Sequence, residues 1–323
     1  MKPVLFVTNH APPFRIGAFK ALHERENVVF ALIGGDVRHG GGGTQAQALP
    51  FPVITPPQRT VARIAASGRY RAVIAGISGR VALPAAYAGA RAGRVPFVLW
   101  ATIWAHPRTP AHALSYLPLR HIYRHADAIA TYGPHVSAYV RSKHPKGPVF
   151  EAPQAVDGAF WGAAATPDRR ADFQVLFAGR PTPEKGFDVL RQAVDPRSLV
   201  VVAGQSPEQL RNVYAGSDVL VVPSLPTRDF LEPRGLVINE AFHQGVPVIA
   251  SDAVGAAAGG LVQHERTGLI VPAGDVEALR AAIARLKDDA TLRRTLGENA
   301  RHEVAKYTYD AWAEGMSRAL AAC

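Results

Sequence analysis

Short apolar segments alternate with segments of helical periodicity along most of this chain, and no other feature restricts its fold as strongly. "PVLFV" is followed by "GAFKALHER", and further along "DVLVV" is followed, after a loop, by "LVINEAFHQ". The apolar segments are rich in Val, Ile and Phe, which favour strands, and the segments between them have the spacing of helices. Repeated strand–helix–strand units build parallel sheets. We therefore expect an α/β protein with parallel sheets.

One interruption divides this pattern. Residues 156–172 contain Pro, Gly, Ala and charge without periodicity, and the length of 323 residues suits two domains. We expect an N-terminal Rossmann-like domain at 1–155, a linker at 156–172, a second Rossmann-like domain at 173–305, and a helix at 306–323 that could pack back on the N-terminal domain. Two such domains would turn the carboxyl ends of their sheets toward a central cleft, where ligands of these folds bind.

Two local patterns add detail to this organisation. Residues 34–45, "GGDVRHGGGGTQ", are rich in glycine, and we expect a mobile loop there. Asp275 follows a glycine and precedes a segment of helical periodicity, so we expect it to cap a helix at about 275–287.

Cysteine usage and hydropathy exclude several classes of protein. The single cysteine, Cys323, allows neither a disulfide framework nor a thiolate metal site. No segment approaches the roughly 18 apolar residues of a membrane-spanning helix, and the N-terminus lacks the apolar core and cleavage site of a signal peptide. We therefore expect a cytoplasmic protein, which could lie peripherally at the inner face of the membrane.

The net charge of +10 is concentrated in the first half of the chain. Residues 1–165 hold 18 Lys and Arg against 6 Asp and Glu, whereas residues 166–323 hold 18 against 20. This asymmetry suggests contact with an anionic membrane or a phosphorylated acceptor, and we expect no nucleic-acid partner. Two segments with cations at helical spacing could make a membrane contact, "RTVARIAASGRYR" and "PLRHIYRH". An ordinary solvated basic surface remains the alternative.

Two acids eight positions apart, Glu232 and Glu240, stand on either side of an expected helix start in "LEPRGLVINEAFHQG". Backbone amides at Gly235, Leu236 and Val237, together with the helix dipole, would form an anion site. Carboxylates accept hydrogen bonds from sugar hydroxyls. The segment therefore predicts a diphosphate at the helix N-terminus with one Glu for each of two sugar rings. The alternative is that one of the two simply faces water on the helix.

Two cations follow the strand in "FAGRPTPEKGF". Arg180 comes directly after Gly179, and Lys185 precedes the glycine that opens the next helix. Arg offers a planar fork for phosphate oxygens and Lys a point charge, so the pair could neutralise a departing nucleoside diphosphate. Either cation alone could be an ordinary surface residue.

Residues 173–275 resemble the donor half of the retaining family 4 glycosyltransferases (glycosyltransferase group 1), which have the GT-B fold. The resemblance rests on "GRPTPEKG", "DVLVVPS", "EPRGLVINEAFHQGVPVIAS" and "ERTGLIVPAGD", which occur in the family's order and at suitable spacing. The first 150 residues resemble the family only in the rhythm of strands and helices and in scattered positions.

The resemblance implies a role for each of these residues. Glu232 would bind hydroxyls of the transferred sugar, and Glu240 would bind the ribose of the nucleotide. Arg180 and Lys185 would hold the diphosphate and stabilise its charge as the glycosidic bond breaks, with the helix-terminal amides beside them. The anomeric configuration would be retained through an oxocarbenium-like ion pair. No metal and no other cofactor is expected, because protein donors can meet the diphosphate charge.

The family usually places a histidine after the strand that corresponds here to "FVLWAT". His106 is the best match and would approach the donor sugar near the reacting carbon; His10, at the end of the first strand, could serve instead, and His106 could equally be a solvated loop residue. His121 and His125 are expected at the surface.

Two positions depart from the family's pattern. The usual Gly-Gly turn after the first strand is replaced by "NHAPPFRIG", in which Gly17 could take its place. Arg234 stands where many members have an aromatic residue. Its side chain could add a phosphate contact or point outward, and we expect it to point outward.

Together these observations predict a metal-independent, retaining glycosyltransferase. The donor would be a nucleoside-diphosphate sugar, and the acceptor a glycan, a lipid-linked molecule or a small molecule. Two other functions remain open: a nucleotide-sugar epimerase of the same architecture, and an inactive nucleotide-sugar-binding subunit. The expected catalytic residues are His106, Arg180, Lys185 and Glu232. The expected donor-binding residues are Gly179, Arg180, Lys185, Glu232, Gly235, Leu236, Val237 and Glu240.

Overall fold

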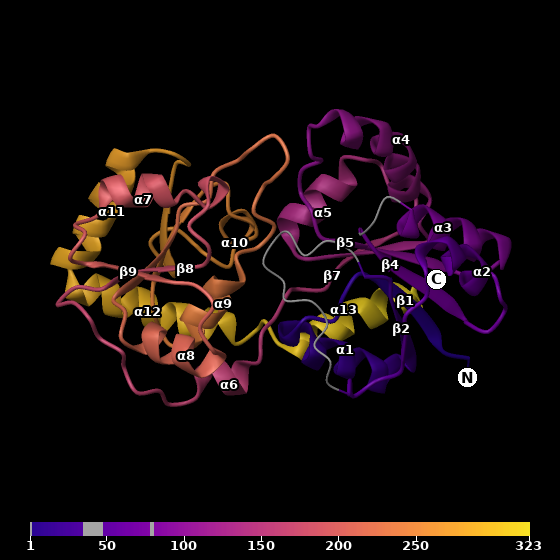
Figure 1. The fold of residues 1–323 in the computed structure, drawn as a ribbon, viewed down its shortest axis with the longest axis horizontal. Coiled ribbons are helices and arrows are strands. Elements are labelled where there is room, and N and C mark those ends of the chain that lie inside the picture. The colour runs from indigo at the N-terminus through magenta and orange to yellow at the C-terminus, as the bar shows by residue number, and fades with distance from the viewer. Residues whose placement is uncertain (1, 35–47, 78–80) are drawn as a thin grey trace. The chain divides into compact units, whose positions relative to one another are not determined.

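The structure, a computed structural model, describes residues 2–34, 48–77 and 81–323 (Figure 1). It divides into two compact units, one formed by Met1–Ala155 with Tyr309–Cys323 and the other by Val156–Thr308. Nearly all of the glycine-rich segment 34–45 lies outside the described residues. None of the helices in the described part of the chain is long and apolar enough to span a bilayer.

A parallel sheet forms the centre of the first unit. In its described part the strand order is β3-β2-β1-β4-β5-β6-β7, and every neighbouring pair runs parallel. The strands are β1 (Val4–Thr8), β2 (Val28–Leu32), β3 (Val53–Ile54), β4 (Ala72–Gly76), β5 (Phe97–Ala101), β6 (Ala128–Thr131) and β7 (Val149–Glu151). Its helices are α1 (Pro13–Glu26), η1 (Gln58–Thr60), α2 (Val61–Ala65), α3 (Ala82–Ala92), α4 (Pro110–His125), α5 (Pro134–Arg141) and α13 (Tyr309–Ala321).

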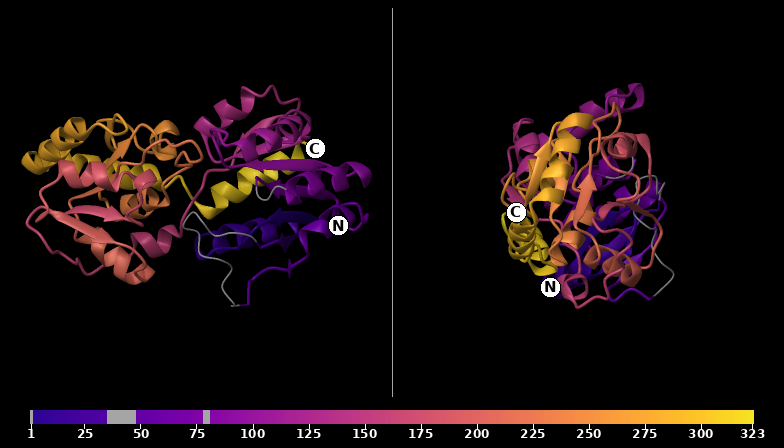
Figure 2. Two further views of the ribbon diagram at one scale, coloured as in Figure 1. Left: turned by 45° about the horizontal axis from the view of Figure 1, so that its top comes forward. Right: turned by 90° about the vertical axis from the view of Figure 1, so that its left-hand side faces the viewer.

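The last helix of the chain, α13, packs beside α1 in the first unit (Figures 1 and 2). The ring of Trp312 lies 5.7 Å from that of Phe19 and stacks at 6.5 Å on Phe6. Gly17, on α1, faces Tyr309: a Cβ atom at position 17 would come within 2.1 Å of its ring. This glycine therefore allows the two helices to approach.

A second parallel sheet, with strand order β12-β11-β10-β8-β9 in the described residues, forms the centre of the second unit. The strands are β8 (Val175–Ala178), β9 (Leu199–Val202), β10 (Val219–Val222), β11 (Val248–Ser251) and β12 (Gly268–Val271). The helices are α6 (Gly158–Gly162), η2 (Pro183–Lys185), α7 (Phe187–Ala193), α8 (Pro207–Ala215), α9 (Leu236–His243), α10 (Gly255–Ala258), α11 (Val276–Asp288) and α12 (Ala290–Val304). The expected α/β class with parallel sheets is confirmed.

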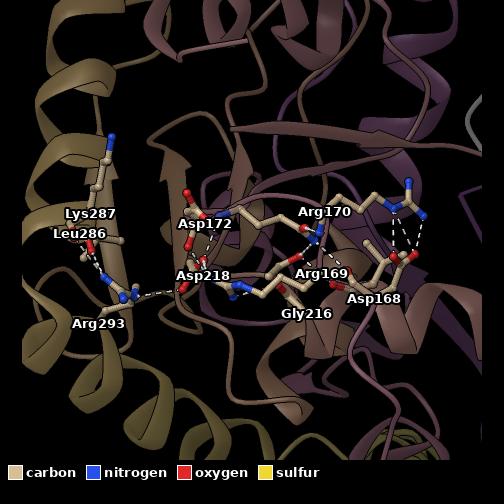
Figure 3. A network of polar contacts seen from close by, with 12 residues as sticks. Asp168, Arg169, Arg170, Asp172, Gly216, Asp218, Leu286, Lys287 and Arg293 are labelled. Atoms are coloured by element: carbon tan, nitrogen blue, oxygen red, sulfur yellow. Dashed lines mark hydrogen bonds and ion pairs between the residues drawn. The ribbon is translucent and has the colours of Figure 1, made fainter. Parts of the chain in front are cut away.

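Residues 156–172, where the sequence predicts a linker, belong to the second unit and include α6. A polar network centred on Asp218 holds their end in place (Figure 3). Arg169 donates to one oxygen of Asp218 at 2.8 Å, and Arg293 of α12 lies 3.4 Å from the other. The segment lacks periodicity because it is largely irregular, and ion pairs and hydrogen bonds hold it against the unit.

The predicted cap of the helix at about 275–287 is confirmed. Asp275 accepts a hydrogen bond from the amide of Ala278 at 2.9 Å, directly before α11. Such a contact satisfies one of the amides that the first turn of a helix leaves without a partner.

Candidate functional site

The order of strands in the second unit places two loops side by side. The chain runs from β8 to its neighbour β9 and then returns to β10 on the opposite side of β8. At such a switch point, the loops that follow the two adjacent strands diverge and leave a crevice in which open α/β sheets bind ligands. The loop after β8 carries residues 179–186, and the loop after β10 carries residues 223–235. Topology therefore brings both cation-bearing and acid-bearing motifs to one place.

Close packing at Gly186 joins these two loops. Gly186 has a left-handed φ of 68°, and a Cβ atom there would lie 1.9 Å from the carbonyl oxygen of Pro223. The amide of Leu225 also donates to the carbonyl of Glu184 at 2.9 Å. Only glycine combines that backbone conformation with so close an approach. The glycine of "EKG" and the proline of "VVPS" are thus parts of a single contact.

Lys185 and Glu232, from the two loops, form an ion pair. The Glu232 side chain is 10% exposed and that of Lys185 32% exposed. The Lys185 ammonium also lies 5.1 Å from the centre of the Phe230 ring, within the range of a cation–π contact. The structure therefore brings together two of the residues expected in the site, Lys185 and Glu232, as partners of opposite charge.

Glu184, a residue that the sequence analysis did not single out, lies beside these cations. Its pKa is lowered by a hydrogen bond from its own amide, by another from Thr182, and by the charges of Lys185 and Arg180. Arg180 itself is exposed, directly after β8 and Gly179. A carboxylate within "PTPEKG" moderates the positive potential of the loop.

Gly235 begins α9 with a left-handed φ of 81°. A Cβ atom there would lie 3.3 Å from side-chain atoms of Ile238 and Val254. The amides of Leu236 and Val237 open the helix, and amides in this position have no intrahelical acceptor. Amides at a helix start and the positive end of the helix dipole are groups that can bind an anion.

Glu240 lies in α9 and pairs with α8. The hydroxyl of Tyr214, which is fully buried, donates to Oε2 of Glu240 at 2.8 Å. Burial raises the pKa of Glu240 to about 7, against the opposing effect of the Tyr214 hydrogen bond. Tyr214 is a further site residue that the sequence analysis did not identify, because nothing in its own segment indicates which acid it meets.

Arg234 does not point outward, and that expectation is wrong. Its side chain is 2% exposed, and the guanidinium lies 4.6 Å from the centre of the Tyr307 ring. The Arg234 carbonyl accepts a hydrogen bond from Ala256 at 2.9 Å, and that of Glu232 one from Gly255 at 2.9 Å, so the loop is tied to α10. A planar guanidinium can be buried when it stacks on an aromatic ring, which explains how this cation is accommodated.

The two histidines considered for the site, His106 and His10, lie in the first unit. His106 follows β5, and its Nε2 donates to the carbonyl of His112 at 2.8 Å while its ring lies 4.9 Å from that of Tyr116. His10 follows β1 and is partly exposed. Lys185, Glu232 and Glu240 all belong to the second unit. Across the described residues, no group of three or more His, Cys, Asp or Glu side chains is arranged to hold a metal ion.

Comparison with known proteins relates part of the second unit to a family. Residues 163–303 match the family described as "Glycosyl transferases group 1". A sulfoquinovosyl transferase, SQD2 of Arabidopsis thaliana, is 29% identical over 167 residues, which cover 42% of this chain and 31% of the relative. The chain thus spans about a third of the length of that curated relative.

Similar solved structures cover almost the whole chain. Sucrose-phosphate synthase from Thermosynechococcus elongatus has a TM-score of 0.75 at 20% identity and covers 98% of each chain. Anabaena HepE in complex with UDP has a TM-score of 0.79 at 15% identity and covers 99% of this chain and 100% of that chain. Residues 163–303 of the second unit therefore match the glycosyl transferases group 1 family, and the chain has the GT-B fold.

Proposed function

We propose that the chain is a retaining glycosyltransferase that moves a sugar from a nucleoside-diphosphate sugar to an acceptor without using a metal ion. The observation that carries this proposal is the cluster at the switch point of the second sheet. There the Lys185–Glu232 ion pair, the amides that open α9 and the hydrogen bond from the buried Tyr214 to the half-buried Glu240 come from adjoining loops and helices of one unit.

The diphosphate would lie on the amides of Leu236 and Val237, with Arg180 and Lys185 supplying positive charge. These groups stabilise the charge that develops on the leaving diphosphate as the bond to the sugar lengthens. Lys185 is paired with Glu232 before donor binds. A phosphate oxygen that attracts the Lys185 ammonium leaves the Glu232 carboxylate to accept hydrogen bonds from sugar hydroxyls.

Glu240 would bind the two ribose hydroxyls of the nucleotide. Tyr214 occupies Oε2 of this carboxylate, so Oε1 is the oxygen directed to the ribose. His106, from the first unit, would approach the transferred sugar, with His10 as the alternative. The acceptor would be a glycan, a lipid-linked molecule or a small molecule.

The charge of the first half of the chain favours a second partner. Its excess of Lys and Arg supports a peripheral contact with an anionic membrane, which would place the protein at the cytoplasmic face. The HepE structure contains UDP, so a uridine nucleotide is the first candidate for the donor.

Thermal unfolding with UDP, GDP, ADP and dTDP tests the donor site. A ligand that binds only the folded state raises its stability by about 2.7 kcal/mol at a hundred times the dissociation constant. We expect one nucleotide to raise the unfolding temperature and its sugar conjugate to support transfer with retained configuration, measured by NMR. Transfer should persist in a chelator.

The variant Lys185→Ala should lower the transfer rate more than the donor affinity, because its charge acts mainly on the leaving group. Lys306→Ala, which removes a lysine paired with Glu303, is the matched control and should change neither. If no nucleotide shifts the unfolding temperature, or if a chelator abolishes transfer, the proposed function is incorrect.

A further inference from the structure

Arg15 lies in the first turn of α1, which follows the carboxyl end of β1, and two buried side chains of the first unit hold it in place. Its Nη2 donates to the hydroxyl of Tyr132, directly after β6, at 2.6 Å. Its guanidinium carbon lies 4.8 Å from the centre of the Trp100 ring. Tyr132 and Trp100 are buried, whereas Arg15 is only partly buried. The guanidinium is therefore fixed, and its other N–H groups are left for further acceptors.

No carboxylate balances the charge of Arg15 in the described part of the chain. The first 23 residues contain no Asp or Glu, and none of the described residues forms an ion pair with this arginine. Glu151, the acid at the carboxyl end of β7, accepts a hydrogen bond from Ser137 at 3.4 Å instead. A partly buried cation without an opposite charge is unfavourable, and a bound anion would supply that charge.

Helix stability does not explain a cation at this position. The amino end of a helix carries partial positive charge, so an arginine in the first turn is disfavoured there. Arg25, in the last turn of the same helix, has the favourable position and also pairs with Asp310 at 3.0 Å. Arg15 has neither advantage. It lies instead at the carboxyl edge of the sheet, where open α/β folds bind their ligands.

We propose that Arg15 binds an anionic group, a phosphate or a carboxylate, on the molecule that accepts the sugar. A guanidinium held by a hydroxyl and an indole ring presents its planar fork in a fixed orientation, which suits two oxygens of such a group. This inference names the class of acceptor and rests on the proposed glycosyl transfer. A neutral acceptor leaves the guanidinium without an opposite charge, so Arg15 determines specificity.

Titration of the whole chain with three sugars tests the binding step without any donor. Glucose, glucuronate and glucose 6-phosphate differ at carbon 6, which carries a hydroxyl, a carboxylate or a phosphate. The NMR signal of the Arg15 Nε–H group, assigned by its loss in Arg15→Met, reports local binding. We expect an anionic sugar to shift this signal saturably and to bind at least about tenfold more tightly than glucose. The tighter of the two anionic sugars identifies the group. If neither shifts the signal, the proposal is overturned.

Three variants separate binding by Arg15 from general attraction, with affinities measured from the backbone amide signals of α1. Arg15→Met should weaken binding of the preferred anionic sugar about tenfold, and Arg15→Lys, which keeps the charge without the fork, about threefold. Arg25→Met is the matched control, because it removes an arginine of the same helix that already has an acid partner. It should change the affinity less than about twofold. Equal losses in Arg15→Met and Arg25→Met would overturn the proposal.

Transfer assays distinguish acceptor binding from a purely structural role. Arg15→Met should raise KM for an anionic acceptor with little change in kcat, because the contact is the same in the ground state and the transition state. A variant that loses activity equally toward charged and neutral acceptors would contradict this assignment. All variants should keep the nucleotide-induced rise in unfolding temperature, so a failure at Arg15 is distinguishable from a failure of the proposed function.

Discussion

The substitution Glu240→Gln should stabilise the second unit while weakening its nucleotide site. Burial raises the pKa of Glu240 from its ordinary 4.5 to about 7. The folded state therefore holds this proton more tightly than the unfolded state, and the folded protein loses stability as the pH rises from about 4.5 through 7. The loss reaches about 3 kcal/mol once the group is ionised in both states. Glutamine cannot ionise, so the variant escapes this loss and still accepts a hydrogen bond from Tyr214.

Hydrogen–deuterium exchange in peptides that cover α9 is the appropriate assay, because a chain with two units need not unfold in one step. The variant's gain in opening free energy should be below about 1 kcal/mol near pH 5 and about 3 kcal/mol near pH 8. Glu298→Gln, an exposed position within α12, is the control and should show no such growth. If the Glu240→Gln variant and the unmodified protein lose stability equally as the pH rises, the argument from burial is refuted.

The same variant should bind the nucleotide more weakly by about 1–3 kcal/mol, as expected for a lost charge-assisted hydrogen bond to the ribose. Isothermal titration above pH 7, where Glu240 is ionised, measures this difference. Unchanged affinity would show that Glu240 does not bind the ribose, and the burial of this carboxyl group would then have no functional explanation.

Three further experiments test particular contacts of the site. Tyr214→Phe removes the hydroxyl that supports the Glu240 carboxylate, so the pH midpoint of nucleotide binding should move upward; a midpoint that stays in place contradicts the contact. Gly186→Ala should destabilise the second unit by more than the roughly 1–2 kcal/mol of a left-handed residue, because its Cβ would meet the Pro223 carbonyl. Urea unfolding should show a smaller effect for Gly274→Ala, which has a similar φ of 84° and a nearest contact of 3.7 Å. A double-mutant cycle of Arg234→Met with Tyr307→Leu should give a coupling of about 1–2 kcal/mol, and additive effects would show that the stacking contributes nothing.

The sequence predicts the backbone of this protein well. Alternation of apolar and helical segments indicates the strands of both sheets, and Asp275 marks a helix start that the structure confirms. These features depend on residues close together in the chain. The irregular segment 156–172 is harder to predict, because its conformation depends on contacts with Asp218. That residue lies some fifty positions away, and its two oxygens face two arginines.

In the site, too, features that depend on residues close together in the chain can be predicted, and contacts between distant residues cannot. "GRPTPEKG" and "EPRGLVINEAF" point to Lys185, Glu232 and Glu240, and the structure gathers the first two into an ion pair. Arg234 is adjacent to these residues, but whether it faces water depends on Tyr307, which only the fold brings near. In the first unit, periodicity suggests that α4 is amphipathic but does not say which of its leucines the core covers.

The position of α13 affects the order in which the two units can fold during synthesis on the ribosome. Trp312 packs in an aromatic cluster with Phe6 and Phe19, residues that are synthesised long before it. The first unit therefore cannot be completed until the second unit and then α13 have been synthesised. The second unit, in contrast, is continuous in the chain. Vectorial synthesis then favours completion of the second unit before the first, with the aromatic face of the nascent N-terminal segment left uncovered in the interval.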